Sequence, residues 1–111
     1  MNIVIVGAGE VGQHLAGLLS NEAHSVTVVD PDPSKSRKLT ESLDGQALVG
    51  DGTRADTLTE AGATSADLVI AVSDDDRVNM LTSVISKKLG AARVILRLKD
   101  RLTRQTGLPV V

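Results

Sequence analysis

The sequence NIVIVGAGEVG at residues 2–12 decides the fold. The aliphatic run Asn2–Val6 predicts a buried strand, and the apolar spacing over Val11–Leu19 predicts a helix directly after it. A G-x-G-x-x-G pattern between a strand and a helix is typical of a loop that holds nucleotide phosphates against free N–H groups at the helix N-terminus. An ordinary glycine-rich turn is the alternative. The nucleotide reading predicts contacts from Gly7, Ala8, Gly9, Glu10, Val11 and Gly12.

Short aliphatic runs alternate with helix-like stretches along the rest of the chain. Strands that are apolar on both faces and separated by helices are typical of a parallel sheet covered on two sides. Right-handed crossovers between such strands give a doubly wound sheet. The sequence therefore predicts an α/β fold, a Rossmann-like doubly wound parallel sheet of at least five strands with helices on both faces. The further strands are expected at Ser25–Val29, Gln46–Val49, Asp67–Val72 and Arg93–Leu98.

Each helix between these strands is expected to turn one apolar face to the sheet. Thr53 is expected to cap the third helix, Gly62 to end it, and Gly90 to end the fourth, Asp76–Leu89. The chain reads as a single domain, 1–111, whose tail, 99–111, fits the pattern poorly beyond a helical turn or two over Leu102–Thr106. In the first helix Val11, Leu15, Leu18 and Leu19 share one face. In the second, which Pro33-Ser34 opens, Leu39 and Leu43 lie four residues apart. In the third, Leu58 and Ala61 are expected to point inward.

Composition argues against several classes of function. The chain has 12 Lys and Arg against 14 Asp and Glu, and a net charge of −2 argues against nonspecific binding to duplex nucleic acid. It has no Phe, Tyr or Trp to stack on the bases of a single strand, and no Cys for a disulfide, a metal site or a nucleophile. No apolar run approaches the roughly 20 residues that span a bilayer. We therefore expect a soluble, intracellular protein that does not insert into a membrane.

Asp30 ends the second expected strand, about 20 residues after the glycines, where dinucleotide-binding folds place an acid. A carboxylate there accepts hydrogen bonds from both ribose hydroxyls and repels a 2′-phosphate. This favours NAD, or an adenosine nucleotide such as ATP or ADP, over NADP. The alternative is a turn-forming Asp before Pro31.

Two further loops follow strands and are expected at the same carboxyl edge of the sheet. The loop Gly50–Thr53 places Asp51 and Thr53 where they contact the adenine side, although helix capping by Thr53 explains the same residues. The loop after the fourth strand places Ser73 and Asp74 beside the second half of a dinucleotide. Acids at a helix N-terminus also complement its dipole, which is the alternative there. Asn79, one turn further on, is expected to hydrogen-bond the loop backbone.

Arg97 lies in the fifth expected strand, where a cation is unusual and requires an anionic partner. We expect that partner to be a ligand phosphate or one of the acids, and the alternative is an edge-strand Arg that reaches solvent. His14 and His24 have no spacing that makes a metal site or a catalytic constellation. The sequence therefore predicts neither a metal centre nor catalytic residues.

With these motifs in place, the chain resembles the TrkA N-terminal domain, also called the KTN or RCK nucleotide-binding domain, over about residues 3–98. Beyond the glycines, the resemblance rests on Val28-Val29-Asp30, Gly50–Thr53, Ala61-Gly62, Ala66-Asp67 and Ala71-Val72-Ser73, with Asp76, Asn79 and Arg97. The resemblance implies a cytosolic regulatory domain that binds NAD(H) or ATP/ADP and gates a membrane-embedded potassium transporter or channel. It also implies a homodimer that assembles into a larger ring beneath the membrane.

The resemblance further implies roles for individual residues. Gly7 to Val11 hold the pyrophosphate, Asp30 the ribose and Asp51 the adenine side, whereas the remaining ribose or phosphate meets Ser73, Asp74 and Arg97. Glu10 departs from the family, because some relatives carry a basic residue there that favours a triphosphate. An acid repels a γ-phosphate, which favours NAD(H), AMP or ADP.

Two other classes of function stay open. An NAD-dependent oxidoreductase, or its cofactor-binding fragment, would carry the same glycine motif. We expect no enzyme, because 111 residues leave no room for a substrate domain and the sequence offers no poised proton donor. A scaffold that has lost ligand binding is the third reading.

Overall fold

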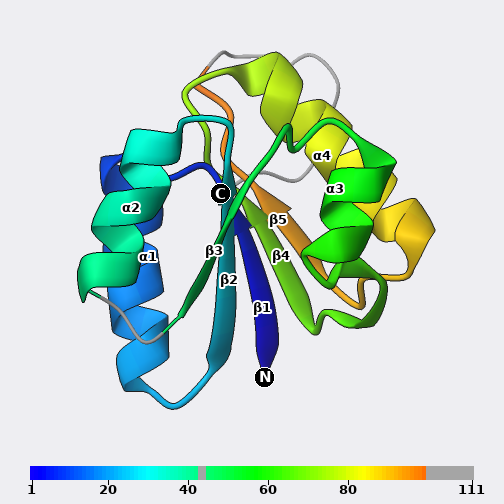
Figure 1. Cartoon of the computed structure of the whole chain (residues 1–111). Helices are drawn as coiled ribbons and strands as arrows, with labels where there is room; N and C mark the ends of the chain where they lie inside the picture. The colour runs from blue at the N-terminus through cyan, green and yellow to red at the C-terminus, as the bar shows by residue number, and fades with distance from the viewer. Residues whose placement is uncertain (43–44, 100–111) are drawn as a thin grey trace.

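The computed structural model describes residues 1–42 and 45–99 as a parallel five-stranded sheet with helices on both faces (Figure 1). The spatial order β3-β2-β1-β4-β5 confirms the predicted doubly wound α/β fold. The strands are β1 (Asn2–Val6), β2 (Ser25–Asp30), β3 (Gln46–Val49), β4 (Leu68–Ala71) and β5 (Val94–Leu96). The helices are α1 (Glu10–Asn21), α2 (Pro33–Ser42), α3 (Ala55–Glu60) and α4 (Asp76–Leu89), with a 3₁₀ helix η1 (Ala63–Ser65) between α3 and β4.

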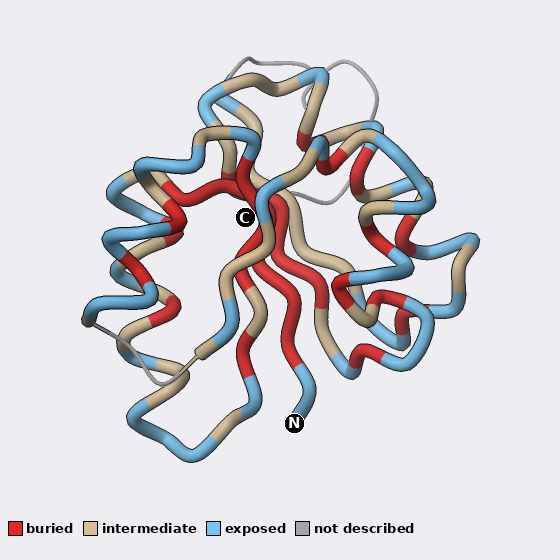
Figure 2. Tube along the Cα trace, viewed as in Figure 1, coloured by how far each residue is buried: buried red, intermediate tan, exposed pale blue. Residues whose placement is uncertain are grey.

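β1 lies at the centre of the sheet, and its side chains alternate between two cores. Ile3 and Ile5 pack into the core beneath α1 and α2, whereas Val4 and Val6 pack into the core beneath α3 and α4. Buried residues therefore run along the central strands in Figure 2. A strand buried on both faces has no polar positions, which explains the unbroken aliphatic run that opens the chain.

The loops after β1 and β4 diverge, because α1 and α4 cover opposite faces of the sheet (Figure 1). In doubly wound folds such a divergence leaves a crevice at the carboxyl ends of the two strands, and ligands bind there. The sheet thereby gathers the loops after its strands at one edge, as the sequence predicted.

The buried face of α1 differs from the predicted one. Val11 is 39% exposed and Leu18 is 50% exposed, so their predicted burial is wrong. The helix instead turns Gly12, Leu15, Ala16 and Leu19 to the sheet. Two small residues at the centre of this face allow close packing on the sheet, which the large apolar pattern did not indicate.

Two local predictions also require correction. Thr53 does not cap α3: the N-cap residue is Arg54, no side chain caps it, and the Thr53 hydroxyl donates to Asp51 instead. β5 ends at Leu96, so Arg97 follows the strand, although its N–H still donates to the carbonyl of Ala71. The predicted helix ends hold, because Gly62 and Gly90 have the positive φ of 96° and 118° that suits glycine after a helix. Leu43 and Leu102–Thr106 lie outside the described residues.

Candidate functional site

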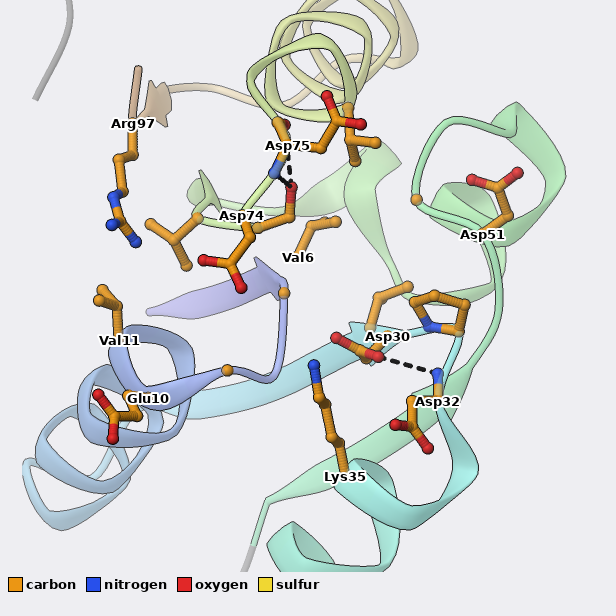
Figure 3. Close-up of a pocket in the computed structure, with 18 residues that line it drawn as sticks. Val6, Glu10, Val11, Asp30, Asp32, Lys35, Asp51, Asp74, Asp75 and Arg97 are labelled. Atoms are coloured by element: carbon orange, nitrogen blue, oxygen red, sulfur yellow. Dashed lines mark hydrogen bonds between the residues drawn. The ribbon is translucent and has the colours of Figure 1, made fainter. Parts of the chain in front are cut away.

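A cavity of about 550 Å³ opens at the carboxyl edge of the sheet, between the loops that follow all five strands (Figure 3). Most of the residues predicted from the sequence meet there. Ala8, Gly12 and Thr53 do not line the cavity, because Ala8 and Gly12 are buried behind it and Thr53 lies behind Asp51. The predicted residues that line it are Gly7, Gly9, Glu10, Val11, Asp30, Asp51, Ser73, Asp74 and Arg97.

The three glycines of the motif have different roles. Gly7 has a φ of +114°, and a Cβ there would lie 2.7 Å from the Ser73 nitrogen. A Cβ on Gly12 would overlap the carbonyl oxygen of Gly7. Both positions therefore require glycine for the fold itself. A Cβ on Gly9 would meet no protein atom within 4 Å, so the protein's own packing does not require glycine there, and the space beside it faces the cavity.

The N-terminus of α1 offers main-chain donors to this space. Gly9 is its N-cap residue, and no side chain caps the helix there. The first N–H groups of a helix have no partner within the helix, and the positive end of the helix dipole, which lies there, attracts anions. At the same edge α4 is capped by the Asp75 side chain, which accepts from the Arg77 N–H at 2.8 Å. A phosphate group fits the uncapped end of α1, where it would meet the N–H donors that no side chain of the protein caps.

Asp30 lies beneath the glycine loop and is 7% exposed. One carboxylate oxygen accepts from the Ala8 N–H at 2.8 Å and the other from the Asp32 N–H at 2.8 Å. Asp30 therefore joins the glycine loop to the turn after β2. The bond from Asp32 is the turn-forming role that the sequence left as an alternative, whereas the bond from Ala8 was not predicted. Each oxygen has a second lone pair, so the carboxylate also keeps acceptor capacity for ribose hydroxyls.

Asp51 is held as a charged group on the β3 side of the cavity. Its Oδ1 accepts from both the hydroxyl and the N–H of Thr53, at 2.7 and 2.9 Å. The Thr53 hydroxyl and then its N–H hold the pKa of Asp51 below its ordinary value. The next residue, Gly52, is fixed from beneath, because its carbonyl accepts from the buried Thr82 hydroxyl of α4 at 2.7 Å.

The substitution Thr53→Val tests this arrangement. Removing the hydroxyl donor is expected to raise the pKa of Asp51 toward its ordinary value, which carboxyl-detected NMR titration measures. The folded-state pKa is depressed, so the stabilisation is present above the unfolded-state pKa and is lost as pH falls through the folded-state pKa. Thr59→Val is the matched control, because the Thr59 hydroxyl donates to the Ala55 carbonyl. An unchanged Asp51 pKa in Thr53→Val contradicts the assignment.

Asn79 ties the loops after β4 and β5 to α4, as the sequence predicted for the β4 loop. It is fully buried, and its Oδ1 accepts from the N–H and the hydroxyl of Ser73, each at 2.9 Å. Its Nδ2 donates to the carbonyls of Ser73 and Arg97, at 3.0 and 2.9 Å. One amide side chain thereby positions the two loops that bring Ser73 and Arg97 to the cavity.

The cavity wall is acidic. Six carboxylates line it, from Glu10, Asp30, Asp32, Asp51, Asp74 and Asp75, against two cations among the described residues, Lys35 and Arg97. Asp74 is partly neutralised by Lys99, whose Nζ lies 3.1 Å from its Oδ1, and Lys99 holds the pKa of Asp74 below its ordinary value. Within the described residues no three His or acidic side chains converge to hold a metal ion.

The sequence did not assign Lys35, Asp32, Asp75 or Val78 to the site, although all four line the cavity. Figure 3 shows Lys35 and Arg97 reaching into the cavity from opposite sides. Lys35 lies in the first turn of α2, five residues after Asp30. A cation in the first turn of a helix opposes its dipole, and this was the signal that could have indicated a role for Lys35.

Comparisons with family models and with known protein sequences agree on one family. The family model described as the TrkA-N domain matches residues 3–106. A Trk system potassium uptake protein TrkA homolog of Archaeoglobus fulgidus is 41% identical over 100 residues, which are 90% of this chain and 22% of that protein. The Trk system potassium uptake protein TrkA of Streptomyces coelicolor is 36% identical over 116 residues, covering 100% of this chain and 52% of the relative. The chain thus spans from about a fifth to about half of these relatives' length.

Solved structures share the fold at low sequence identity. The GsuK channel bound to NAD matches with a TM-score of 0.81 at 21% identity, over 94% of this chain and 19% of that one. The Kef C-terminal domain of Shewanella denitrificans in an AMP-bound form matches with a TM-score of 0.79 at 24% identity, over 96% of this chain and 67% of that one. Likeness at this level of identity shows a common fold.

Proposed function

The chain belongs to the TrkA-N domain family, and from this premise we propose that it is a nucleotide-sensing regulatory domain of a potassium uptake system. The observation that carries the proposal is the open space beside Gly9. The protein's own packing does not require glycine there, yet the space lies at the uncapped N-terminus of α1 and above the Asp30 carboxylate. This combination suits a phosphate joined to a ribose.

The acidic wall supports a ligand of limited negative charge. Six carboxylates surround the cavity, and Glu10 is the first residue of the helix that meets the phosphate. Each added phosphate charge is opposed by these acids. We therefore favour NAD(H), AMP or ADP over ATP. Two structural neighbours, by their names, are bound to NAD and to AMP, and both ligands carry an adenosine 5′-phosphate.

Regulation, and not catalysis, is the proposed outcome of binding. The described lining of the cavity holds no histidine, the side chain that most often acts as a general acid, and the chain has no tyrosine or cysteine. An oxidoreductase, the alternative, requires turnover of NADH with a small carbonyl compound. We expect none, and sustained loss of the 340 nm absorbance with such a compound would favour the alternative.

The proposed mechanism is a shift of population. A ligand that binds one arrangement of the domains more tightly moves the equilibrium toward it, by no more than its difference in affinity. We propose that the domain acts in the cytoplasm as a homodimer or larger ring, on the inner face of a membrane-embedded potassium transporter. None of the helices within the described residues has the length and apolarity to cross a bilayer.

The first experiment measures nucleotide binding by the wild-type chain and by Gly9→Ala. Because the chain lacks Phe, Tyr and Trp, a 260 nm band that travels with the purified protein reports bound nucleotide. Titration by NADH fluorescence, with competition by AMP, ADP and ATP, then ranks the ligands. A methyl group on Gly9 occupies the space of the phosphate, so we expect Gly9→Ala to bind at least about tenfold more weakly.

The control is the stability of Gly9→Ala. Its new Cβ meets no protein atom, so its unfolding free energy is expected to stay within about 1 kcal/mol of wild type, with the N-cap preference as the main difference. Absence of NADH and adenine-nucleotide binding to the wild type at millimolar concentration contradicts the proposal and favours a scaffold role.

A further inference from the structure

Lys35 is the one group lining the cavity on the α2 side that carries a positive charge within the described residues. Its side chain is half-buried and extends from α2 into the cavity, whereas the neighbouring Asp32 carboxylate points another way (Figure 3). Lysines usually place their charge in bulk water. A lysine that reaches into a concave, acidic site therefore needs an explanation beyond solubility.

The carboxylates nearest to Lys35 in the sequence already accept hydrogen bonds from other donors. Both oxygens of Asp30 accept main-chain N–H groups, from Ala8 and Asp32. Oδ1 of Asp32 accepts from both the N–H and the hydroxyl of Ser34, at 2.9 and 2.8 Å. Within residues 1–42 and 45–99, no carboxylate oxygen lies within 4.0 Å of the Lys35 ammonium in an ion pair. Its three N–H donors therefore remain available.

The charge of Lys35 nevertheless acts across the cavity. It helps to lower the pKa of Asp32 on its own side and the pKa of Asp74 on the opposite wall. An ammonium whose charge acts on both walls of the cavity would also act on a ligand that spans them. Arg97 approaches from the other side (Figure 3), so the two cations lie on opposite sides of the cavity.

We propose that Lys35 is a specificity-determining residue that binds a phosphate on the adenosine half of the ligand, and so selects phosphorylated adenosine over adenosine itself. This inference rests on the proposed nucleotide function. An ammonium with free donors in an acidic cavity is the group that offsets the carboxylates when a phosphate enters. The two candidate positions are the ribose 5′ carbon and its 2′ edge, where the Lys35 ammonium would offset the repulsion that the Asp30 carboxylate exerts on a 2′-phosphate.

The test compares Lys35→Met and Lys35→Arg with wild type by calorimetric titration of adenosine, 5′-AMP and 2′-AMP. Lys35→Met is expected to bind the phosphorylated ligand about tenfold more weakly and adenosine within about twofold of wild type. Lys35→Arg keeps the charge and is expected to restore most of the affinity. The matched control is Lys88→Met, which removes the same charge from the last turn of α4, outside the lining of the cavity.

Loss of 5′-AMP affinity alone places the phosphate at the 5′ carbon, and loss of 2′-AMP affinity alone places it at the 2′ edge. The salt dependence of 5′-AMP or 2′-AMP binding is also expected to be shallower in Lys35→Met, because one fewer charge takes part. Equal losses for adenosine and both phosphates would mean a structural role and overturn the inference, as would unchanged affinities. A wild type that binds NADH but none of the three ligands overturns this inference alone. A wild type that binds neither NADH nor any of the three overturns the proposed function as well.

Discussion

Gly12→Ala is expected to destabilise the domain by about 3 kcal/mol or more, a large part of the total stability of a domain of this size. Alanine is ordinarily the better residue inside a helix, by roughly 1 kcal/mol relative to glycine. Here the new methyl group would overlap the carbonyl oxygen of Gly7, with the Gly7 carbonyl carbon at 2.9 Å. Both atoms belong to the main chain of a loop that is itself packed against Ser73, so the loop cannot give way cheaply.

The measurement is denaturant unfolding followed by far-ultraviolet circular dichroism, because the chain has no aromatic residue to report by fluorescence. A fall in the melting temperature on the order of 10 °C is expected alongside. Gly9→Ala, three residues earlier in the same motif, makes the same chemical change without an overlap and is the matched control. A Gly12→Ala variant as stable as wild type would show that the loop adapts, and the steric account of the motif would fail.

The comparison of Gly12 with Gly9 also shows how much of the site the sequence alone could predict. The glycine motif, Asp30 and the alternation of strands and helices are local patterns. Each one predicts the structure of residues that are close to it in the sequence. They located the cavity and half of the residues that line it. The motif did not distinguish its glycines, however: Gly12 is buried behind the cavity and serves packing, whereas Gly9 lines it. That difference depends on where the β4 loop and the Gly7 carbonyl lie in space.

Other features escaped prediction for the same reason. Thr53 precedes a helix and was assigned as its cap, but the hydroxyl has a stronger acceptor in the Asp51 carboxylate two residues earlier. Val11 and Leu18 fit an apolar stripe, but the face that meets the sheet is centred on Gly12 and Ala16. Lys35 belongs to the cavity only because the first turn of α2 lies beside Asp30. In each case a contact made by folding prevailed over a pattern in the sequence.

Asn79→Ala is expected to have the second large effect, a loss of about 3 kcal/mol of stability together with weaker nucleotide binding. The Asn79 amide makes four hydrogen bonds in a fully buried position, and its removal leaves the Ser73 N–H without this acceptor and the Ser73 and Arg97 carbonyls without this donor. Each buried group left unpaired costs about 1–3 kcal/mol. Ser73 and Arg97 then lose the amide that holds their loops together at the cavity, so affinity falls with stability.

Asn79→Asp separates the two halves of this network, because a carboxylate keeps the acceptor for Ser73 and removes both donors. Placing that charge against the Ser73 and Arg97 carbonyls is expected to cost at least as much as Asn79→Ala at neutral pH and less at low pH, where the protonated acid donates one bond. Ser83→Ala, which deletes one hydroxyl that donates to the Asn79 carbonyl, is the control and is expected to cost no more than about 1 kcal/mol. If Asn79→Ala matched Ser83→Ala in stability, water would satisfy the loops as well as Asn79 does. Asn79 would then have no part in positioning Arg97, which would be held by the bond from its N–H to the Ala71 carbonyl.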